Sequence, residues 1–297
     1  MPPPHAPADI AESRAATSPE LDPPIVAAVD GSATSYHAAV WAAVDAKLRG
    51  CPLQIITSVA APGAFGPGPA GQRLRAEGER VLTAALRVTR TAVAGETVTV
   101  GTRMVDRPIV PELIERSSHS RILVVGNRGL GAYRRELLGS VSSAVIRYAH
   151  CPVAVVSSAV ATDPDSAHKP VLVGVDGTDN SMPAIRVAFE EASWRGVGVV
   201  ALHAWDDTDE THSPAKGGSA ARQQEEELLA ECLAGFGERY PDVSVRQILV
   251  RDRPARSLLA AAEDTQLIVT GSHGRDSFTG MLLGSTSAAL LPLVKCP

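Results

Sequence analysis

The sequence predicts an α/β protein made of two tandem, doubly wound domains, each built on a parallel sheet. The chain matches itself when it is shifted by 146 residues, and this period has the length of a whole domain. Within each half, short β-branched runs alternate with amphipathic stretches, as in parallel sheets covered by helices. A length of 297 residues suits two domains, and 44% apolar residues with 4% aromatic ones suit aliphatic cores.

Matching motifs anchor the repeat. At the offset of 146, Asp30-Gly31-Ser32 pairs with Asp176-Gly177-Thr178, Arg49-Gly50 with Arg195-Gly196, and Asp106-Arg107-Pro108 with Asp252-Arg253-Pro254. One residue is then lost, and Leu137-Leu138-Gly139-Ser140 pairs with Leu282-Leu283-Gly284-Ser285. Two related domains fused head to tail explain these matches more simply than chance does.

In the first half, residues 25–29 form a β-branched run that predicts a strand. Residues 32–49 carry apolar side chains at helical spacing, and Gly50 stands where a helix should stop. Residues 60–71 are crowded with Pro, Gly and Ala, which predicts a loop. Further strands are expected at 53–58, 98–105, 122–126 and 153–156, and further helices at 72–94, 108–117 and 140–150.

The second half repeats this order. Strands are expected at 171–175, 199–203, 243–250 and 267–271, and helices at 181–195, 220–239, 255–263 and from 285 onward. The sequence stops at Pro297, where the first half continues with the strand at 153–156. We therefore expect the second sheet to lack its last, edge strand.

Composition sets the domain limits and the expected compartment. We assign 1–23 as a disordered extension, 24–157 as the first domain, 158–168 as a linker and 169–297 as the second domain. The extension lacks the apolar core of a signal peptide, and no run approaches the roughly 20 apolar residues of a membrane span, so a cytoplasmic protein without a membrane partner is expected. A net charge of −5 without a basic cluster argues against nucleic acid as a partner.

The four cysteines do not form a chemical motif. Cys51, Cys151, Cys232 and Cys296 show no Cys-x-x-Cys spacing, which argues against a zinc site or a redox pair. We interpret them as buried or idle thiols.

Ligands of doubly wound sheets bind past the carboxyl ends of the strands, where strand order reverses. Asp30 and Gly126 lie at two such ends in the first half, and Asp176 and Gly271 do so in the second. A carboxylate there can accept hydrogen bonds from ribose hydroxyls, and glycines let backbone N–H groups turn toward a phosphate. The pattern predicts a nucleotide site in each half.

A glycine-rich signature completes each predicted site. It reads Gly126-Asn127-Arg128-Gly129, nine residues, Gly139-Ser140, and then Gly271-Ser272-His273-Gly274, nine residues, Gly284-Ser285. The last two residues open a helix whose N–H groups and dipole attract an anion, and Ser140 and Ser142 can add hydroxyl donors. Ser140 and Ser285 could also be simple helix N-caps, which use the same geometry.

Over nearly its whole length, the chain resembles the universal stress protein family, in its ATP-binding, tandem form. The resemblance rests on both glycine signatures, on Val-Asp-Gly-Ser at 29–32 and Val-Asp-Gly-Thr at 175–178, and on Leu-Leu-Gly-Ser-Val-Ser at 137–142. It implies Rossmann-like sheets of strand order 3-2-1-4-5, one ATP per domain, with Mg²⁺ as a candidate companion, and a regulatory role in stress, growth arrest or dormancy. A homodimer or protein partners are expected.

The resemblance also assigns binding residues. In the first half it places ribose on Asp30 and Gly126, adenine on the Ser58 backbone, and phosphates on Gly129, Gly139, Ser140 and Ser142. The matching set is Asp176, Ala204, Gly271, Gly274, Gly284, Ser285 and Ser287. The second loop has Asp276 where the first has Gly131, which brings a negative charge near the expected phosphates.

The sequence offers no catalytic constellation. Its lysines, Lys47, Lys169, Lys216 and Lys295, all lie outside the glycine-rich loops, and phosphoryl transfer needs positive charge at the moving phosphate. We therefore expect a nucleotide-gated regulator with at most weak ATPase activity. The alternatives are a slow adenine-nucleotide hydrolase or transferase, and an interaction scaffold with degenerate sites.

Three other polar positions have simpler interpretations. His203 is interpreted as a hydrogen-bonded core residue, and Arg128 as a solvated loop side chain, with a contact to the phosphates as the alternative for Arg128. The Asp-Arg-Pro motifs are interpreted as a strand end followed by a helix start with proline near its first turn. A role for Arg107 or Arg253 in pairing the domains is the alternative.

Overall fold

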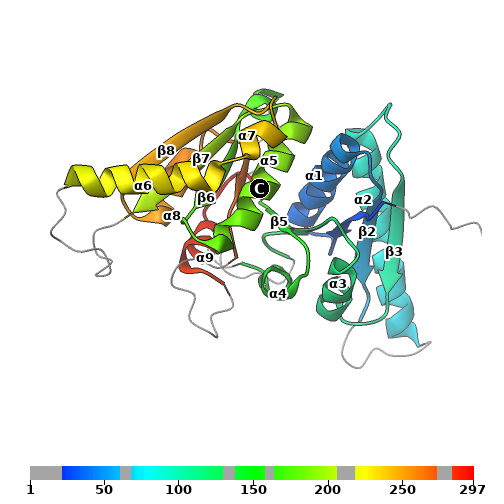
Figure 1. The fold of residues 1–297 in the computed structure, drawn as a ribbon. Coiled ribbons are helices and arrows are strands. Elements are labelled where there is room, and N and C mark those ends of the chain that lie inside the picture. Colours follow the sequence, from blue (N-terminus) through cyan, green and yellow to red (C-terminus); the bar gives the residue numbers. More distant parts are fainter. Residues whose placement is uncertain (1–21, 61–67, 130–137, 158–163, 206–217, 273–282) are drawn as a thin grey trace, which may run out of the picture.

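The computed structural model describes residues 22–60, 68–129, 138–157, 164–205, 218–272 and 283–297. They form two α/β units that lie side by side, as Figure 1 shows. No helix among these residues is both long enough and apolar enough to cross a membrane.

In the first unit, strands and helices alternate throughout. Its strands are β1 (Ile25–Ala28), β2 (Leu53–Ser58), β3 (Val100–Val105), β4 (Ile122–Gly126) and β5 (Val153–Val156). Its helices are α1 (Ala33–Arg49), α2 (Pro69–Ala92), α3 (Ile109–Ser117) and α4 (Ser140–Tyr148). The strand order is β3-β2-β1-β4-β5 and every pairing is parallel, which confirms the predicted doubly wound sheet.

The sheet of the first unit buries both of its faces. Ile25 and Ala27 of β1 belong to the apolar cluster under α1 and α2, whereas Val26 belongs to the cluster under α3 and α4. This alternation follows from the two-residue period of a strand. Strand order reverses at β1, between β2 and β4, so the carboxyl ends of these strands frame the place where ligands bind in such sheets.

The second unit repeats this architecture with one strand fewer. Its strands are β6 (Val171–Val175), β7 (Val199–Trp205), β8 (Val245–Arg251) and β9 (Leu267–Val269), in the parallel order β8-β7-β6-β9. Its α-helices are α5 (Met182–Arg195), α6 (Gly218–Leu233), α7 (Phe236–Arg239), α8 (Pro254–Ala262) and α9 (Ser285–Leu290). Among the residues that the structure describes, this sheet has four strands, which confirms the prediction of a second sheet without its last strand.

One hydrogen bond beside β9 matches a hydrogen bond between β4 and the start of β5. In the first unit, the Leu123 N–H donates a 3.0 Å hydrogen bond to the Pro152 carbonyl, just before β5. In the second, the Ile268 N–H donates a 2.9 Å bond to the carbonyl of Pro297. The hydrogen bond that precedes the β4–β5 pairing in the first unit therefore has an equivalent in the second unit.

Several predicted boundaries need correction. The helix expected at 220–239 is two helices, because Gly235 adopts a left-handed φ of 78° between α6 and α7. The helix expected from 181 begins at Met182, after a 3₁₀ turn, η2 (Asp179–Ser181), and the expected linker contains a second 3₁₀ turn, η1 (Pro164–His168). The helix stops at Gly50 and Gly196 are confirmed, because both residues cap their helices with left-handed backbone.

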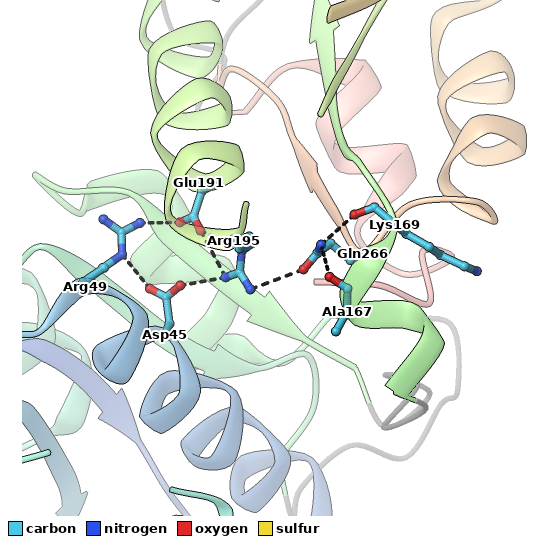
Figure 2. A network of polar contacts seen from close by, with 7 residues as sticks. All are labelled: Asp45, Arg49, Ala167, Lys169, Glu191, Arg195 and Gln266. Atoms are coloured by element: carbon cyan, nitrogen blue, oxygen red, sulfur yellow. Dashed lines mark hydrogen bonds and ion pairs between the residues drawn. The ribbon is translucent and has the colours of Figure 1, made fainter. Parts of the chain in front are cut away.

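A buried ring of ion pairs joins the two units where α1 and α5 end (Figure 2). Asp45 accepts from Arg49 Nε at 2.8 Å and from Arg195 Nη2 at 2.6 Å. Glu191 accepts from Arg195 at 3.0 Å and from Arg49. All four side chains are at most 8% exposed. Each arginine thus bridges a carboxylate of its own helix to one of the other domain.

The ring follows the internal repeat. Asp45 and Glu191 are 146 residues apart, as are Arg49 and Arg195, so each helix contributes one acid and one arginine a turn later. Burial, together with the neighbouring Glu191 charge, raises the pKa of Asp45 to about 6, although both arginines oppose the shift. Sequence reasoning missed this contact, although the repeated i, i+4 acid–arginine pair was a visible signal.

Candidate functional site

A cavity of about 740 Å³ opens at the carboxyl ends of β1, β2 and β4 in the first domain. The seven residues predicted for the first site all line it: Asp30, Ser58, Gly126, Gly129, Gly139, Ser140 and Ser142. Its volume lies within the usual range for small-molecule sites. The structure therefore brings the predicted residues together around one space.

The turn after β1 fixes the carboxylate of Asp30. Its Oδ1 accepts from the Ser32 backbone N–H at 2.9 Å and from the Ser32 hydroxyl at 2.6 Å. The Ser32 side chain also caps α1 by accepting from the Ser35 N–H. Asp30 lies two residues beyond the end of β1, in the turn that leads to α1. The turn holds its carboxylate at the cavity wall.

Two glycines permit the loop after β4 to approach this turn. A Cβ at Gly126 would lie 3.0 Å from the backbone carbon of Thr34 and 3.1 Å from the Ser35 nitrogen, at the start of α1. A Cβ at Gly129 would overlap Asp30 Oδ2. Thr34 also donates its hydroxyl hydrogen bond to the Arg128 carbonyl. The predicted ribose end and the glycine-rich loop are thus in direct contact.

Gly139 is the N-cap of α4, and Ser140 is its first helical residue. The interpretation of Ser140 as an N-cap is therefore wrong, and Gly284 likewise replaces Ser285 as the N-cap of α9. Within the described part of the chain, no side-chain hydrogen bond caps the N-terminus of α4, and N–H groups at such a terminus can bind an anion. Ser142 donates its hydroxyl to the Gly126 carbonyl at 2.6 Å, so it donates to a phosphate only if that bond opens.

The remaining wall of the cavity is largely apolar. Leu74 and Val81 line it from α2, and Ile109 and Val141 from the other face of the sheet. Such side chains can hold a flat aromatic base. Ser58, the residue assigned to adenine, directs its hydroxyl to the Arg107 carbonyl at 2.8 Å, which leaves recognition at this position to the backbone.

Three charged side chains line the cavity. Asp30 and Glu77 are its acidic lining residues, and Arg128 is the only basic one among the described residues that line it. Their field reaches Tyr36, whose pKa is raised by burial and by the negative charges of Glu77 and Asp30. The carboxylate of Asp30 suits hydroxyl donors, and the N-terminus of α4 suits an anion.

The second domain rebuilds much of this arrangement. Asp176 Oδ1 accepts from the Thr178 N–H at 2.9 Å and from its hydroxyl at 2.7 Å. Ser287 donates to the Gly271 carbonyl at 2.7 Å, as Ser142 does to Gly126. Ala204 lies in β7, and Gly284 and Ser285 begin α9. Gly274, with His273 and Asp276, lies outside the described residues.

His203 is a buried, hydrogen-bonded residue, as predicted. Its Nδ1 lies 2.7 Å from the Val175 carbonyl, and its Nε2 lies 2.8 Å from Glu225 Oε2 of α6. Glu225 could not be identified as its partner from the sequence, because the connection between β7 and α6 decides which helix face meets the sheet.

The Asp-Arg-Pro motifs act within their own domains, so the first interpretation is confirmed. Pro254 is the first residue of α8, and Pro108 directly precedes α3. Arg107 forms ion pairs with Glu112 and Glu115 of α3, the latter at 3.0 Å. The domain contact uses Arg49 and Arg195 instead.

The family model described as "Universal stress protein family" matches residues 23–157 and 167–297. The chain belongs to the universal stress protein family. Two universal stress proteins of Mycobacterium tuberculosis are 44% and 39% identical to it, each over 279 residues; both alignments cover 92% of this chain, and they cover 95% and 94% of the relatives.

Solved structures agree on the fold. A universal stress protein from Archaeoglobus fulgidus aligns with a TM-score of 0.64 at 22% identity, covering 91% of this chain and 92% of the other. A universal stress protein structure from Pseudomonas aeruginosa aligns with a TM-score of 0.60 at 14% identity, covering 92% and 91%. At these identities the likeness shows that both domains of this member have the fold of those proteins.

Proposed function

We propose that this universal stress protein binds ATP in its first domain and acts as a nucleotide-dependent regulator in stress response or growth arrest. One observation carries the proposal: the residues predicted for ribose, adenine and phosphates line a single cavity at the point where strand order reverses. Residues that are distant in the sequence converge there because the fold brings three strand ends together.

The cavity has a partner for each part of ATP. The apolar residues between α2 and the sheet suit the base, and Asp30 suits paired ribose hydroxyls. The uncapped N-terminus of α4 and Arg128 suit the phosphates, whose remaining charge Mg²⁺ can neutralise. The described residues of this chain contain no cluster of three side chains able to hold a metal ion, so Mg²⁺ would arrive with the nucleotide.

Regulation suits the site better than rapid catalysis. Phosphoryl transfer requires concentrated positive charge and an oriented nucleophile. The described lining offers Arg128 as its basic group and also carries two carboxylates, Asp30 and Glu77. ATP would instead join the turn after β1 to the loop after β4, which already touch through Thr34 and Arg128. Protein partners or a second copy of the chain would read the resulting surface.

The test is the affinity of ATP for Asp30→Ala, measured by isothermal titration calorimetry. Losing hydrogen bonds to a charged group costs about 1.5–3 kcal/mol, which corresponds to a Kd raised about tenfold to a hundredfold. Asp242→Ala removes an exposed carboxylate of the second domain and serves as the control. An unchanged Kd in Asp30→Ala would refute the assignment, and multiple turnovers abolished by Ser140→Ala would favour the hydrolase.

A further inference from the structure

The two domains differ at one equivalent position on their second strands. Thr57 and His203 are 146 residues apart, and each bonds to the equivalent carbonyl of the neighbouring strand or its end. The Thr57 hydroxyl donates to the Val29 carbonyl at 2.7 Å, and His203 Nδ1 lies 2.7 Å from the Val175 carbonyl. Both side chains therefore point to the same side of their sheets, but the imidazole reaches further.

The helix opposite this position carries a glutamate in both domains. Glu77 of α2 lies one turn before the buried Val81, and Glu225 of α6 lies one turn before the buried Leu229. The buried residues Val81, Ala85 and Thr89 of α2 have the same spacing as the buried residues Glu225, Leu229 and Leu233 of α6. Glu225 therefore takes the place of Val81 and not that of Glu77.

The two glutamates also have different surroundings. Glu77 is 56% exposed, pairs with Arg80 on its own helix, and lines the cavity together with Thr57. Glu225 is only 8% exposed, and its Oε2 lies 2.8 Å from His203 Nε2. A carbonyl oxygen can only accept, so His203 Nδ1 carries a hydrogen and donates it to the Val175 carbonyl. A second hydrogen lies between His203 Nε2 and Glu225 Oε2 and joins these two atoms. The imidazole thus spans the space that is cavity in the first domain.

We propose that the His203–Glu225 pair closes the base end of the second site and makes the two sites of this chain unequal. The proposal rests on the proposed function of the first site. A nucleotide entering the second domain must first separate a buried, hydrogen-bonded pair, and this cost weakens its binding. We expect ATP to bind the second site at least about tenfold more weakly than the first.

A reciprocal exchange tests the pair. His203→Thr gives the second domain the residue of the first, and Thr57→His gives the first domain the residue of the second, in the cavity wall that Val81 also lines. Equilibrium dialysis with radiolabelled ATP counts the bound nucleotides, and Asp30→Ala or Asp176→Ala in each background assigns them to a site. We expect one tight site in the wild type, a second one in His203→Thr, and a Kd raised about tenfold or more at the first site in Thr57→His.

The outcomes separate this inference from the proposed function. Two equal sites in the wild type, or no added site in His203→Thr, would overturn the inference and leave ATP binding by the first domain in place. If ATP binds only after His203→Thr and is lost with Asp176→Ala, the inference stands and the first-site assignment fails. If neither the wild type nor His203→Thr binds ATP, both proposals fail.

A folding control keeps the exchange interpretable. His203→Thr leaves Glu225 buried beside a shorter side chain, which is expected to destabilise the second domain. His203→Thr/Glu225→Ala removes both members of the pair, and thermal unfolding identifies which variants are folded. Should both second-domain variants unfold, Thr57→His still decides the matter, because an unchanged first-site Kd would overturn the inference.

Discussion

Gly129→Ala tests the contact between the glycine-rich loop and the ribose carboxylate. A methyl group at this position would overlap Asp30 Oδ2, so either the carboxylate or the loop must move. Two hydrogen bonds from Ser32, at 2.9 and 2.6 Å, hold Asp30 in its present orientation. The substitution therefore misplaces the carboxylate that is proposed to bind ribose, and it does so without removing a charge.

The expected loss follows from the hydrogen bonds at stake. Hydrogen bonds to a charged group contribute about 1.5–3 kcal/mol, so the Kd for ATP should rise about tenfold to a hundredfold. Calorimetric titration measures this change, and thermal unfolding checks the fold. Gly101→Ala in β3 is the matched control, because a Cβ there meets nothing within 4 Å. An unchanged Kd in Gly129→Ala, or an equal loss in Gly101→Ala, would refute the reasoning.

Three further predictions concern packing and protonation. Gly126→Ala should lower the free energy of unfolding by about 1–3 kcal/mol in urea titrations, because its methyl group meets the backbone of α1. The pKa of Asp45 is about 6 in the folded chain, above its usual 3.8, so the folded chain binds more protons than the unfolded chain between these values. The free energy of unfolding should therefore fall by up to about 3 kcal/mol as pH rises from about 4 to 6.5. Asp45→Asn should lack this fall, and a pH dependence of unfolding parallel to that of the wild type would contradict the prediction. Burial raises the pKa of the Cys151 thiol to about 11, so mass spectrometry should find it unlabelled by iodoacetamide at pH 8 in the native protein and labelled in denaturant.

The internal repeat made most of the fold predictable. The alternation of strands and helices and the helix stops at Gly50 and Gly196 follow from local patterns present in both halves, and comparing the halves predicts the missing edge strand, whereas the strand order was implied by the family resemblance. The break at Gly235 was missed because the helical pattern continues on both sides of it, and only the backbone shows that φ is positive there. Periodicity indicates which residues face a core, but it does not show where a helix bends.

The polar contacts between elements were less predictable. The first-site residues could be collected from the family resemblance, together with the rule that ligands of such sheets bind past the strand ends. The partners of Asp45 and His203 lie on other elements, and their distances depend on how two domains dock and on how α6 packs against β7. A single sequence carries the residue types of such pairs but not their separation in space.

The most direct test of the account is the nucleotide content of the purified protein, released by heat and quantified by ion-pair chromatography as moles per chain. The account predicts about one equivalent of ATP in the wild type, retained in Asp176→Ala and lost in Asp30→Ala. A protein that contains no adenine nucleotide and takes up none when ATP is added would contradict it.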